Sequence, residues 1–346
     1  MTQMFTFDAS DYAKIFAEQD YVCIPQGLTE AAFERLSKQV NDYIDAKRMP
    51  EFARGNKQQS LYDFPRDNDF YEQFVQAMAT LAGLDPEKLV ISERHIKAYE
   101  ADAVPNPMPH KDRLATELSV GFTIRNPKNS TLVLYPHTDR RVNPFQSWAE
   151  LRAALPPEKL PAEVLKNAPR IAFQDQPRDV IAFRGNETWH LREGGADTIM
   201  LYFKINAFHS DPLGEDPRTE AFSKQTQQFA ALPDRDLADL VPILARRIDY
   251  IHRRYNCLWQ EQLGVVLAGK MHFDIDEQEL QLLRAIDGKR PIRALLSPSV
   301  EASEYTALLH KLRHLAQQGI IDLLPPKTVS DANGTSEMSK TRVLVS

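Results

Sequence analysis

Three residues from two distant segments of the chain could together hold one metal ion. His110 and Asp112 lie two positions apart in the segment PHKDR, and His190 lies in the segment WHLR. Side chains two apart point to the same face of an extended strand, so the imidazole of His110 and the carboxylate of Asp112 can reach a common ion. Two histidines and one carboxylate are the ligand set typical of non-haem Fe(II) oxygenases, and this set leaves open positions for a co-substrate and O₂. His190 is the best candidate for the third ligand.

A second His-x-Asp pair offers an alternative metal site. His137 and Asp139 have the same spacing, and Pro136 directly precedes them. Proline cannot donate a hydrogen bond to a neighbouring strand, so it disfavours a central strand at this position. The pair at 137 and 139 therefore stays open as the weaker alternative.

The segments around these residues are typical of β-strands. Residues 89–99 alternate in polarity, which predicts a strand with Glu93, His95, Lys97 and Tyr99 on one face. His95 is expected to be a polar histidine with satisfied hydrogen bonds. Shorter strand candidates, separated by turns rich in Pro, Gly and Asn, cover residues 118–124, 131–135, 171–173, 180–183 and 198–205.

Helices are expected to flank these strands. Apolar residues recur at helical spacing after Thr29, which can cap a helix, and further helices are predicted at 11–18, at 69–81 and within 147–167. The predicted fold is mainly β with α. Many short strands with turn-rich connections favour a jelly-roll or cupin-like double-stranded β-helix over a doubly wound parallel sheet.

Two domains are expected. Residues 1–232 would form the jelly-roll domain, closed by a polar, turn-rich stretch at 209–232. Residues 233–326 would form a small helical, winged-helix-like C-terminal domain, helical from 237 towards 254, with Asp276 and Glu279 as the capping box of the next helix and a terminal strand at 320–324. The tail at 327–346, rich in Ser, Thr and Lys, is expected to be mobile.

Composition excludes several classes of protein. The net charge of the 346 residues is −6, and residues 277–326 carry six basic and six acidic side chains, so neither the chain nor its C-terminal part should attract nucleic acid. No apolar run reaches the roughly 18 residues of a membrane span. Cys23 and Cys257 form no CxxC motif, and the N-terminus lacks the pattern of a signal peptide. A cytoplasmic protein that does not bind membranes is expected.

Five short segments in order resemble the phytanoyl-CoA dioxygenase-like family of Fe(II)/2-oxoglutarate oxygenases. They lie between residues 11 and 208 and read AEQDYVCIPQGLTEAAFERL, ERHIKAY, PHKD, LVLYPHTDRRVNPF and RDVIAFRGNETWHLR. The resemblance implies a double-stranded β-helix in which His110, Asp112 and His190 bind Fe(II), with 2-oxoglutarate as co-substrate and O₂ as oxidant.

The cation that should bind the far carboxylate of 2-oxoglutarate is not where the family usually has it. Burying this carboxylate requires a paired cation. The family usually supplies an arginine about eleven positions after the distal histidine, where this chain has Leu201. Arg192, Lys97 and Lys204 are the candidate replacements. Alternatively, Arg192 pairs with Glu187 or Glu193, and Lys204 ends a strand in solvent.

The resemblance implies hydroxylation of an unactivated C–H bond of a small molecule in specialised metabolism, with release of succinate and CO₂. Asp112 argues against halogenation, because related halogenases have a small residue at that position. Three alternatives stay open: a hydroxylase of a peptide, protein or carrier-bound substrate, a metal-dependent cupin that needs no 2-oxoglutarate, and a non-catalytic jelly-roll module that binds a metal or ligand. A homodimer formed through the C-terminal domain is also possible.

Overall fold

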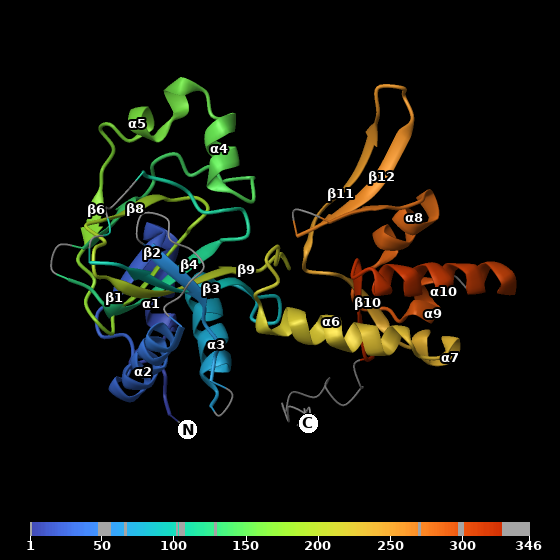
Figure 1. Ribbon diagram of the computed structural model, residues 1–346, viewed down its shortest axis with the longest axis horizontal. Coiled ribbons are helices and arrows are strands. Elements are labelled where there is room, and N and C mark those ends of the chain that lie inside the picture. Colours follow the sequence, from blue (N-terminus) through green and yellow to red (C-terminus); the bar gives the residue numbers. More distant parts are fainter. Residues whose placement is uncertain are drawn as a thin grey trace. The chain divides into compact units, whose positions relative to one another are not determined.

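The computed structural model describes residues 2–47, 57–65, 68–101, 103, 108–127, 130–268, 271–296 and 301–326 (Figure 1). The chain divides into two compact units, Met1–Thr219 and Glu220–Ser346. The boundary expected at 232 lies inside the second unit, and helix α6 (Pro217–Ala230) occupies most of the stretch expected to be turn-rich. The predicted tail at 327–346 and most of the proline-rich loop before His110 lie outside the described residues.

Two antiparallel sheets form the centre of the first unit. The larger has the order β1-β7-β4-β9-β3-β2 and the smaller the order β6-β5-β8. The larger sheet consists of β1 (Tyr21–Ile24), β2 (Lys57–Leu61), β3 (Val90–Tyr99), β4 (Leu118–Arg125), β7 (Val180–Phe183) and β9 (Ile199–Asn206). The smaller consists of β5 (Thr131–Tyr135), β6 (Ile171–Phe173) and β8 (Trp189–Glu193). The strands predicted at 89–99, 118–124, 131–135, 171–173, 180–183 and 198–205 are confirmed to within about one residue at each end, and the antiparallel pairing excludes a doubly wound parallel sheet.

Three helices pack against one face of the larger sheet: α1 (Ser10–Gln19), α2 (Glu30–Lys47) and α3 (Phe70–Ala82). The contact is largely aromatic, because Phe74 of α3 lies 4.4 Å from Phe203 of β9 and 5.9 Å from Phe122 of β4, measured between ring centroids. Successive strand residues point to opposite faces, so burying Phe203 here turns Tyr202 and Lys204 to the other face. This alternation directs the polar residues of β9 towards the smaller sheet.

The two sheets face each other across a small apolar cluster. Leu132 and Leu134 of β5 pack against Ile181 and Phe183 of β7. The insertion after β5 carries α4 (Trp148–Ala154), a 3-10 turn (Pro157–Lys159) and α5 (Pro161–Val164), as the sequence predicts. A sandwich of antiparallel sheets flanked by helices is the arrangement expected of a jelly-roll core.

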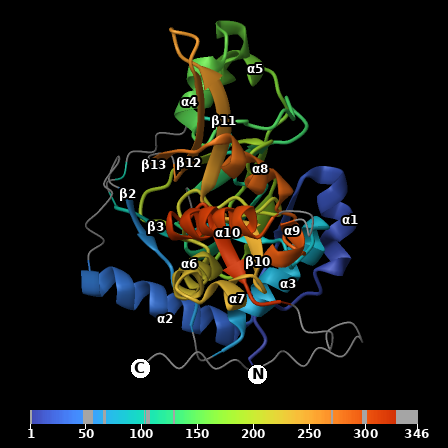
Figure 2. The ribbon, with the colours of Figure 1, turned by 90° about the vertical axis from the view of Figure 1, so that its right-hand side faces the viewer.

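The second unit is mixed α/β and not the small helical domain expected from the sequence. It contains α7 (Asp234–Leu237), α8 (Glu277–Ala285), α9 (Ile292–Leu295) and α10 (Ala302–Gln317). Strand β10 (Val241–Leu244) pairs with β14 (Ile321–Leu324), and β11 (Ile248–Tyr255), β12 (Glu261–Leu267) and β13 (Met271–Asp274) form a three-stranded sheet (Figure 2). The winged-helix likeness stays a prediction.

The prediction of a helix from 237 towards 254 is wrong, because most of this segment forms strands β10 and β11. Most side chains of β11 are at least partly exposed, so the strand lacks the buried alternation that would reveal it. It is extended because it pairs with β12, whose Leu263, Val265 and Leu267 are buried in the core of the unit. The capping box of Asp276 and Glu279 is confirmed, because each side chain accepts a hydrogen bond from the backbone N–H of the other.

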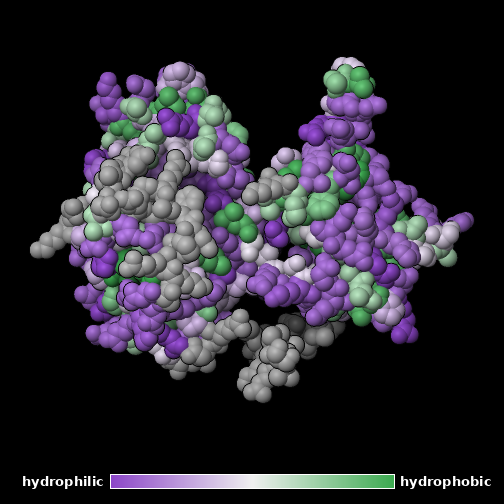
Figure 3. All heavy atoms as spheres, viewed as in Figure 1, coloured by the Kyte–Doolittle hydropathy of each residue, from purple (hydrophilic) through white to green (hydrophobic). Residues whose placement is uncertain are grey.

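The visible surface of both units is mostly hydrophilic, with a small apolar patch at the end of the β11–β12 hairpin (Figure 3). Leu258 and Trp259 of this turn are 71% and 84% exposed. Among the described helices, none combines the length and the apolar character needed to cross a bilayer.

Candidate active site

The two histidines of the predicted triad are joined through their backbones. His110 and His190 form an isolated antiparallel bridge, in which the N–H of each donates to the carbonyl of the other at 2.9 Å. Asp112 is held in the same way, because its N–H donates to the carbonyl of Gly185 at 2.9 Å. Main-chain hydrogen bonds therefore fix the positions of all three residues, although they come from distant parts of the chain.

The three side chains converge on one point. One ligand atom from each of His110, Asp112 and His190 lies within 4.8 Å of the other two, and Nε2 of His190 is 3.7 Å from Oδ2 of Asp112. On each histidine Nδ1 faces a backbone carbonyl, that of Met108 at 3.2 Å for His110 and that of Thr188 at 2.9 Å for His190. A proton held at Nδ1 leaves the lone pair on Nε2 for a metal ion. Such a group could hold a divalent ion.

The electrostatics of the triad favour the protonation states of metal ligands. Burial, with help from the nearby His110, lowers the pKa of His190 to about 3. Burial also lowers the pKa of His110. Burial opposes ionisation of Asp112, but the Lys204 ammonium outweighs it, and the pKa of Asp112 is lowered to about 2. Neutral imidazoles and an ionised carboxylate are the forms that bind metal ions.

Gly185 makes room for the triad, a role that sequence reasoning missed. A Cβ at position 185 would lie 2.6 Å from Oδ2 of Asp112 and 2.6 Å from Cγ2 of Thr116. Both distances are far below van der Waals contact, so only glycine fits without displacing the carboxylate. The sequence feature that could have indicated this role is the glycine five residues before His190, in the segment RGNETWH.

Lys204 lies inside the first unit and not in solvent, so the alternative of a solvated strand end is wrong. Its side chain is 6% exposed and its ammonium contacts the carboxylate of Asp112. The same ammonium donates to Oγ of Ser119 at 2.9 Å. Lys204 is therefore a direct neighbour of a candidate metal ligand.

Arg192 has a different partner from the two glutamates considered. Its guanidinium donates to both carboxylate oxygens of Asp175, at 3.1 and 3.0 Å, and to Oγ of Ser130 at 3.1 Å. Both ends of this pair are buried, with side-chain exposures of 6% for Arg192 and 0% for Asp175. Glu193 pairs instead with Arg170, at 2.9 Å. The guanidinium of Arg192 is thus neutralised by a residue that the sequence did not point to.

Lys97 is the third candidate cation. Its ammonium lies 5.1 Å from the centre of the Tyr202 ring, and the ammonium of Lys204 lies 5.8 Å from the same ring. Among the residues that the structure describes, no carboxylate is within ion-pair distance of Lys97. The positive charge of Lys97 also contributes to the lowered pKa of His110, which places Lys97 within electrostatic reach of the triad.

The alternative pair, His137 and Asp139, does not form a metal site. Both residues have left-handed backbone conformations, with φ of 59° and 50°, so they do not belong to a strand. Nδ1 of His137 faces Asp20 at 3.5 Å, whereas Asp139 accepts from Nε of Arg141 at 2.6 Å. The two side chains have separate partners, and among the described residues they join no group of metal ligands, so the prediction of a metal pair here is wrong.

His95 lies between two carboxylates, but only its Nε2 makes a hydrogen bond, so the prediction of satisfied hydrogen bonds is confirmed at one ring nitrogen and not at Nδ1. Its Nδ1 lies 3.1 Å from a carboxylate oxygen of Glu93, and its Nε2 lies 2.8 Å from one of Glu215. Arg113 pairs with Glu93 at 2.8 Å. Burial disfavours the charged imidazole, but the two carboxylates outweigh it and raise the pKa of His95.

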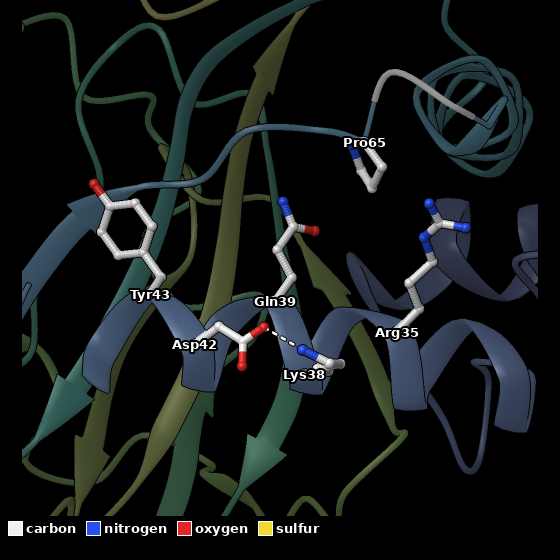
Figure 4. A pocket seen from close by; sticks show the side chains of 6 residues that line it. All are labelled: Arg35, Lys38, Gln39, Asp42, Tyr43 and Pro65. Atoms are coloured by element: carbon white, nitrogen blue, oxygen red, sulfur yellow. Dashed lines mark hydrogen bonds and ion pairs between the residues drawn. The ribbon is translucent and has the colours of Figure 1, made fainter. Parts of the chain in front are cut away.

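A separate hollow of about 460 Å³ lies between helix α2 and the segment that carries Pro65 (Figure 4). Arg35, Gln39 and Tyr43 line it, with Pro65 opposite them. None of the triad residues belongs to it. This open surface depression is not the candidate active site.

No protein-family model matches the chain, and no curated protein matches it, so the phytanoyl-CoA dioxygenase-like resemblance stays a prediction.

Part of the chain is similar to solved structures of non-haem, 2-oxoglutarate-dependent enzymes. The carbocyclase SnoK of nogalamycin biosynthesis is 15% identical, with 56% of this chain and 82% of SnoK covered and a TM-score of 0.44. The epimerase SnoN in complex with Fe³⁺, α-ketoglutarate and nogalamycin RO is 15% identical, with coverages of 57% and 85% and a TM-score of 0.43. A prolyl-4-hydroxylase of Pseudomonas putida is 11% identical, with coverages of 57% and 98% and a TM-score of 0.39. The functional assignment therefore depends on the geometry of the site itself.

Proposed function

We propose that the protein is an Fe(II)/2-oxoglutarate-dependent oxygenase that hydroxylates a small molecule. The observation that carries this proposal is the convergence of His110, Asp112 and His190, whose ligand atoms lie within 4.8 Å of one another. Two imidazoles and one carboxylate are the donors that suit non-haem Fe(II). When bound, iron and 2-oxoglutarate supply the activation of O₂, with succinate and CO₂ as the co-products.

Lys97 is the residue assigned to the far carboxylate of 2-oxoglutarate. Arg192 is neutralised by Asp175, and the ammonium of Lys204 already contacts Asp112. Lys97 lies on the same face of the sheet, and although its charge acts on Glu93, no carboxylate among the described residues lies within ion-pair distance of it. A buried co-substrate carboxylate requires a cation that is still free to pair, and Lys97 meets this requirement.

The remaining residues hold these groups in place. Tyr202 lies between the two lysines, and its hydroxyl accepts from Nε and Nη2 of Arg192 at 3.3 Å. The buried pair of Arg192 and Asp175 therefore orients the ring over which the Lys97 ammonium lies. Asp175 in turn accepts from Oγ1 of Thr123 at 2.6 Å. This network links the smaller sheet to β4 of the larger one.

Succinate release tests this proposal. The purified chain, supplied with Fe(II), 2-oxoglutarate and O₂, should convert 2-oxoglutarate to succinate slowly without substrate and faster with a suitable substrate. His110→Ala should abolish this release, and Lys97→Met should raise the concentration of 2-oxoglutarate needed for it. A chain that releases no succinate with any of a broad panel of small molecules and peptides would contradict the assignment. Turnover with peptides alone would favour the peptide or carrier-bound alternative.

A non-catalytic binding module is the second candidate, and the contact between Lys204 and Asp112 favours it. An ammonium beside the carboxylate supplies the positive charge that a metal ion would otherwise provide. If the Lys204 ammonium keeps its contact with Asp112 and no metal ion binds, the jelly roll can hold a ligand but cannot carry out metal-dependent chemistry. A triad that binds no Fe(II) even with 2-oxoglutarate present would support this reading over the enzyme.

A further inference from the structure

The second unit carries a pair of histidines that the proposed oxygenase chemistry does not use. His252 lies on β11 and His272 on β13, at the two sides of the central strand β12. Their Nε2 atoms are 2.7 Å apart, and their rings are stacked with centroids 5.0 Å apart. Two imidazole nitrogens from different strands therefore meet at one point on this face of the sheet.

The strand register explains why they meet. His252 is paired with Gly264 of β12, and His272 is paired with Val266 of the same strand. Residues 264 and 266 lie two apart, so both histidines project from the same face. The rings lean towards each other over Gly264, the position without a side chain.

Gly264 keeps the space between the rings open. A Cβ at this position would lie 2.7 Å from Nε2 of His252 and 2.8 Å from Nε2 of His272. The glycine is not required by a left-handed backbone, since no positive φ is found at Gly264. Its effect is to leave room beneath the two nitrogens.

The 2.7 Å contact between the two Nε2 atoms needs a proton on one of them, and a metal ion bound there takes the place of that proton. On the far side of His272, Nδ1 faces the carboxylate of Asp274 at 3.7 Å. A carboxylate behind the second nitrogen of a histidine is the usual outer partner of a metal-bound imidazole, because it favours the proton at Nδ1.

We propose that His252 and His272 form a binding site for a late divalent transition-metal ion such as Zn²⁺ or Cu²⁺ over Gly264. Imidazole nitrogen suits these ions, whereas Mg²⁺ and Ca²⁺ prefer oxygen ligands. Tetrahedral zinc with zinc–nitrogen bonds of about 2.0–2.1 Å holds two nitrogens about 3.3 Å apart, so the two Nε2 atoms, now 2.7 Å apart, need to separate by about 0.6 Å. The bound ion joins β11 to β13 across β12, and water completes its coordination.

A titration of tag-free, full-length protein tests this site. The chain carries His110→Ala and His190→Ala, which remove the triad histidines, and Cys257→Ser, which removes an exposed thiol that could also bind metal. Calorimetry with Zn²⁺ should give one equivalent per chain, and Mg²⁺ should give no heat of binding. Adding His252→Ala or His272→Ala to this background should weaken Zn²⁺ binding at least tenfold.

Two further variants separate metal binding from a simple hydrogen bond between the histidines. Gly264→Ala keeps both imidazoles but fills the space between them, and it should also weaken Zn²⁺ binding. Asp274→Asn should weaken it less than either histidine variant does, as expected of an outer partner. His310→Ala, which removes an exposed histidine of α10, is the matched control and should change nothing. Far-UV circular dichroism checks that each variant is folded.

Paramagnetic resonance with Cu²⁺ gives an independent readout. In the triad-deficient background the spectrum should show coupling to two nitrogen nuclei, and either histidine variant should remove one of them. Zn²⁺ binding that is unaffected by His252→Ala and His272→Ala, or no binding to the triad-deficient chain, would overturn the proposal. The pair would then be a hydrogen bond between two histidines and nothing more.

Discussion

The ammonium of Lys204 contacts the carboxylate of Asp112, one of the three residues that converge on the candidate iron site. The same carboxylate oxygen lies 3.7 Å from Nε2 of His190. A metal ion bound by Asp112 must therefore share this carboxylate with a buried cation. Two positive charges close together repel each other unless an anion joins them. The anionic co-substrate can provide that compensation, so metal and co-substrate should bind cooperatively.

Lys204→Met should therefore raise the affinity for Fe(II) in the absence of 2-oxoglutarate. The substitution removes the competing cation and leaves the three ligands in place. It should also reduce the extent to which 2-oxoglutarate tightens metal binding, because less repulsion has to be offset. Anaerobic calorimetry with Fe(II), or with Mn²⁺ in its place, measures both effects. Metal affinity that falls in Lys204→Met would contradict this account.

Lys97→Met should weaken 2-oxoglutarate binding and leave metal binding unchanged. Removing one partner of a buried charge pair costs about 2 kcal/mol or more, which corresponds to roughly 30-fold in affinity. The matched control is Lys88→Met on the loop before β3, since Lys88 is exposed and forms a surface ion pair with Asp85. Equilibrium dialysis with labelled 2-oxoglutarate and Mn²⁺ gives the dissociation constants. Equal constants for wild type and Lys97→Met would remove Lys97 from the binding site.

Arg192→Met should act mainly on stability. It leaves the fully buried carboxylate of Asp175 without its bidentate partner, a change that typically costs about 3–5 kcal/mol. The double variant with Asp175→Leu should recover much of this loss, because it removes the unpaired charge. Urea denaturation, followed by a probe in the first unit, measures both. If Arg192→Met were as stable as wild type but had lost 2-oxoglutarate binding, Arg192 and not Lys97 would be the co-substrate cation.

Gly185→Ala should damage the metal site directly. The added Cβ meets Oδ2 of Asp112 and Cγ2 of Thr116 at 2.6 Å, so the carboxylate must move. Overpacking of this kind costs about 1–3 kcal/mol of stability. The affinity for the metal should fall at least tenfold. The loss of folding stability alone would not produce this fall in a protein that stays folded. Unchanged Mn²⁺ binding in a folded Gly185→Ala protein would show that Asp112 is not a ligand.

The ion pairs of His95 should make the stability of the first unit depend on pH. The pKa of His95 is raised in the folded protein above its usual value of about 6.5, so the stabilisation is complete below about pH 6 and is lost as the pH rises through the folded value. Glu93 and Glu215 face His95, and Arg113 and Lys97 lie around Glu93. His95→Gln should therefore cost more stability at pH 5.5 than at pH 9.

Tryptophan fluorescence can follow this effect in the first unit alone. Of the three tryptophans, Trp148 and Trp189 lie in the first unit and Trp259 in the second, so a Trp259→Phe background isolates the signal. Urea curves of wild-type and His95→Gln proteins in this background are compared at the two pH values. A difference in stability that is the same at both would contradict a charged His95.

Sequence alone predicted the short strands that turn residues separate. The strands at 131–135, 171–173 and 180–183 match to the residue, and the spacing of His110 and Asp112 places both on one side of the chain. The sequence could not show that the backbones of His110 and His190 pair with each other. It also could not show that Asp175 neutralises Arg192, because such contacts form between residues distant in the chain. The strand β11 was missed since its exposed side chains carry no pattern, and pairing with β12 alone makes it extended.

Anaerobic titration with Fe(II), read by absorption after addition of 2-oxoglutarate, tests the central claim most directly. The account predicts one Fe(II) per chain in the Cys257→Ser, His252→Ala background, together with the visible metal-to-ligand charge-transfer band of chelated 2-oxoglutarate. His110→Ala and His190→Ala should each remove both the bound ion and the band. Iron binding and a band that survive these two substitutions would contradict the assignment of the triad.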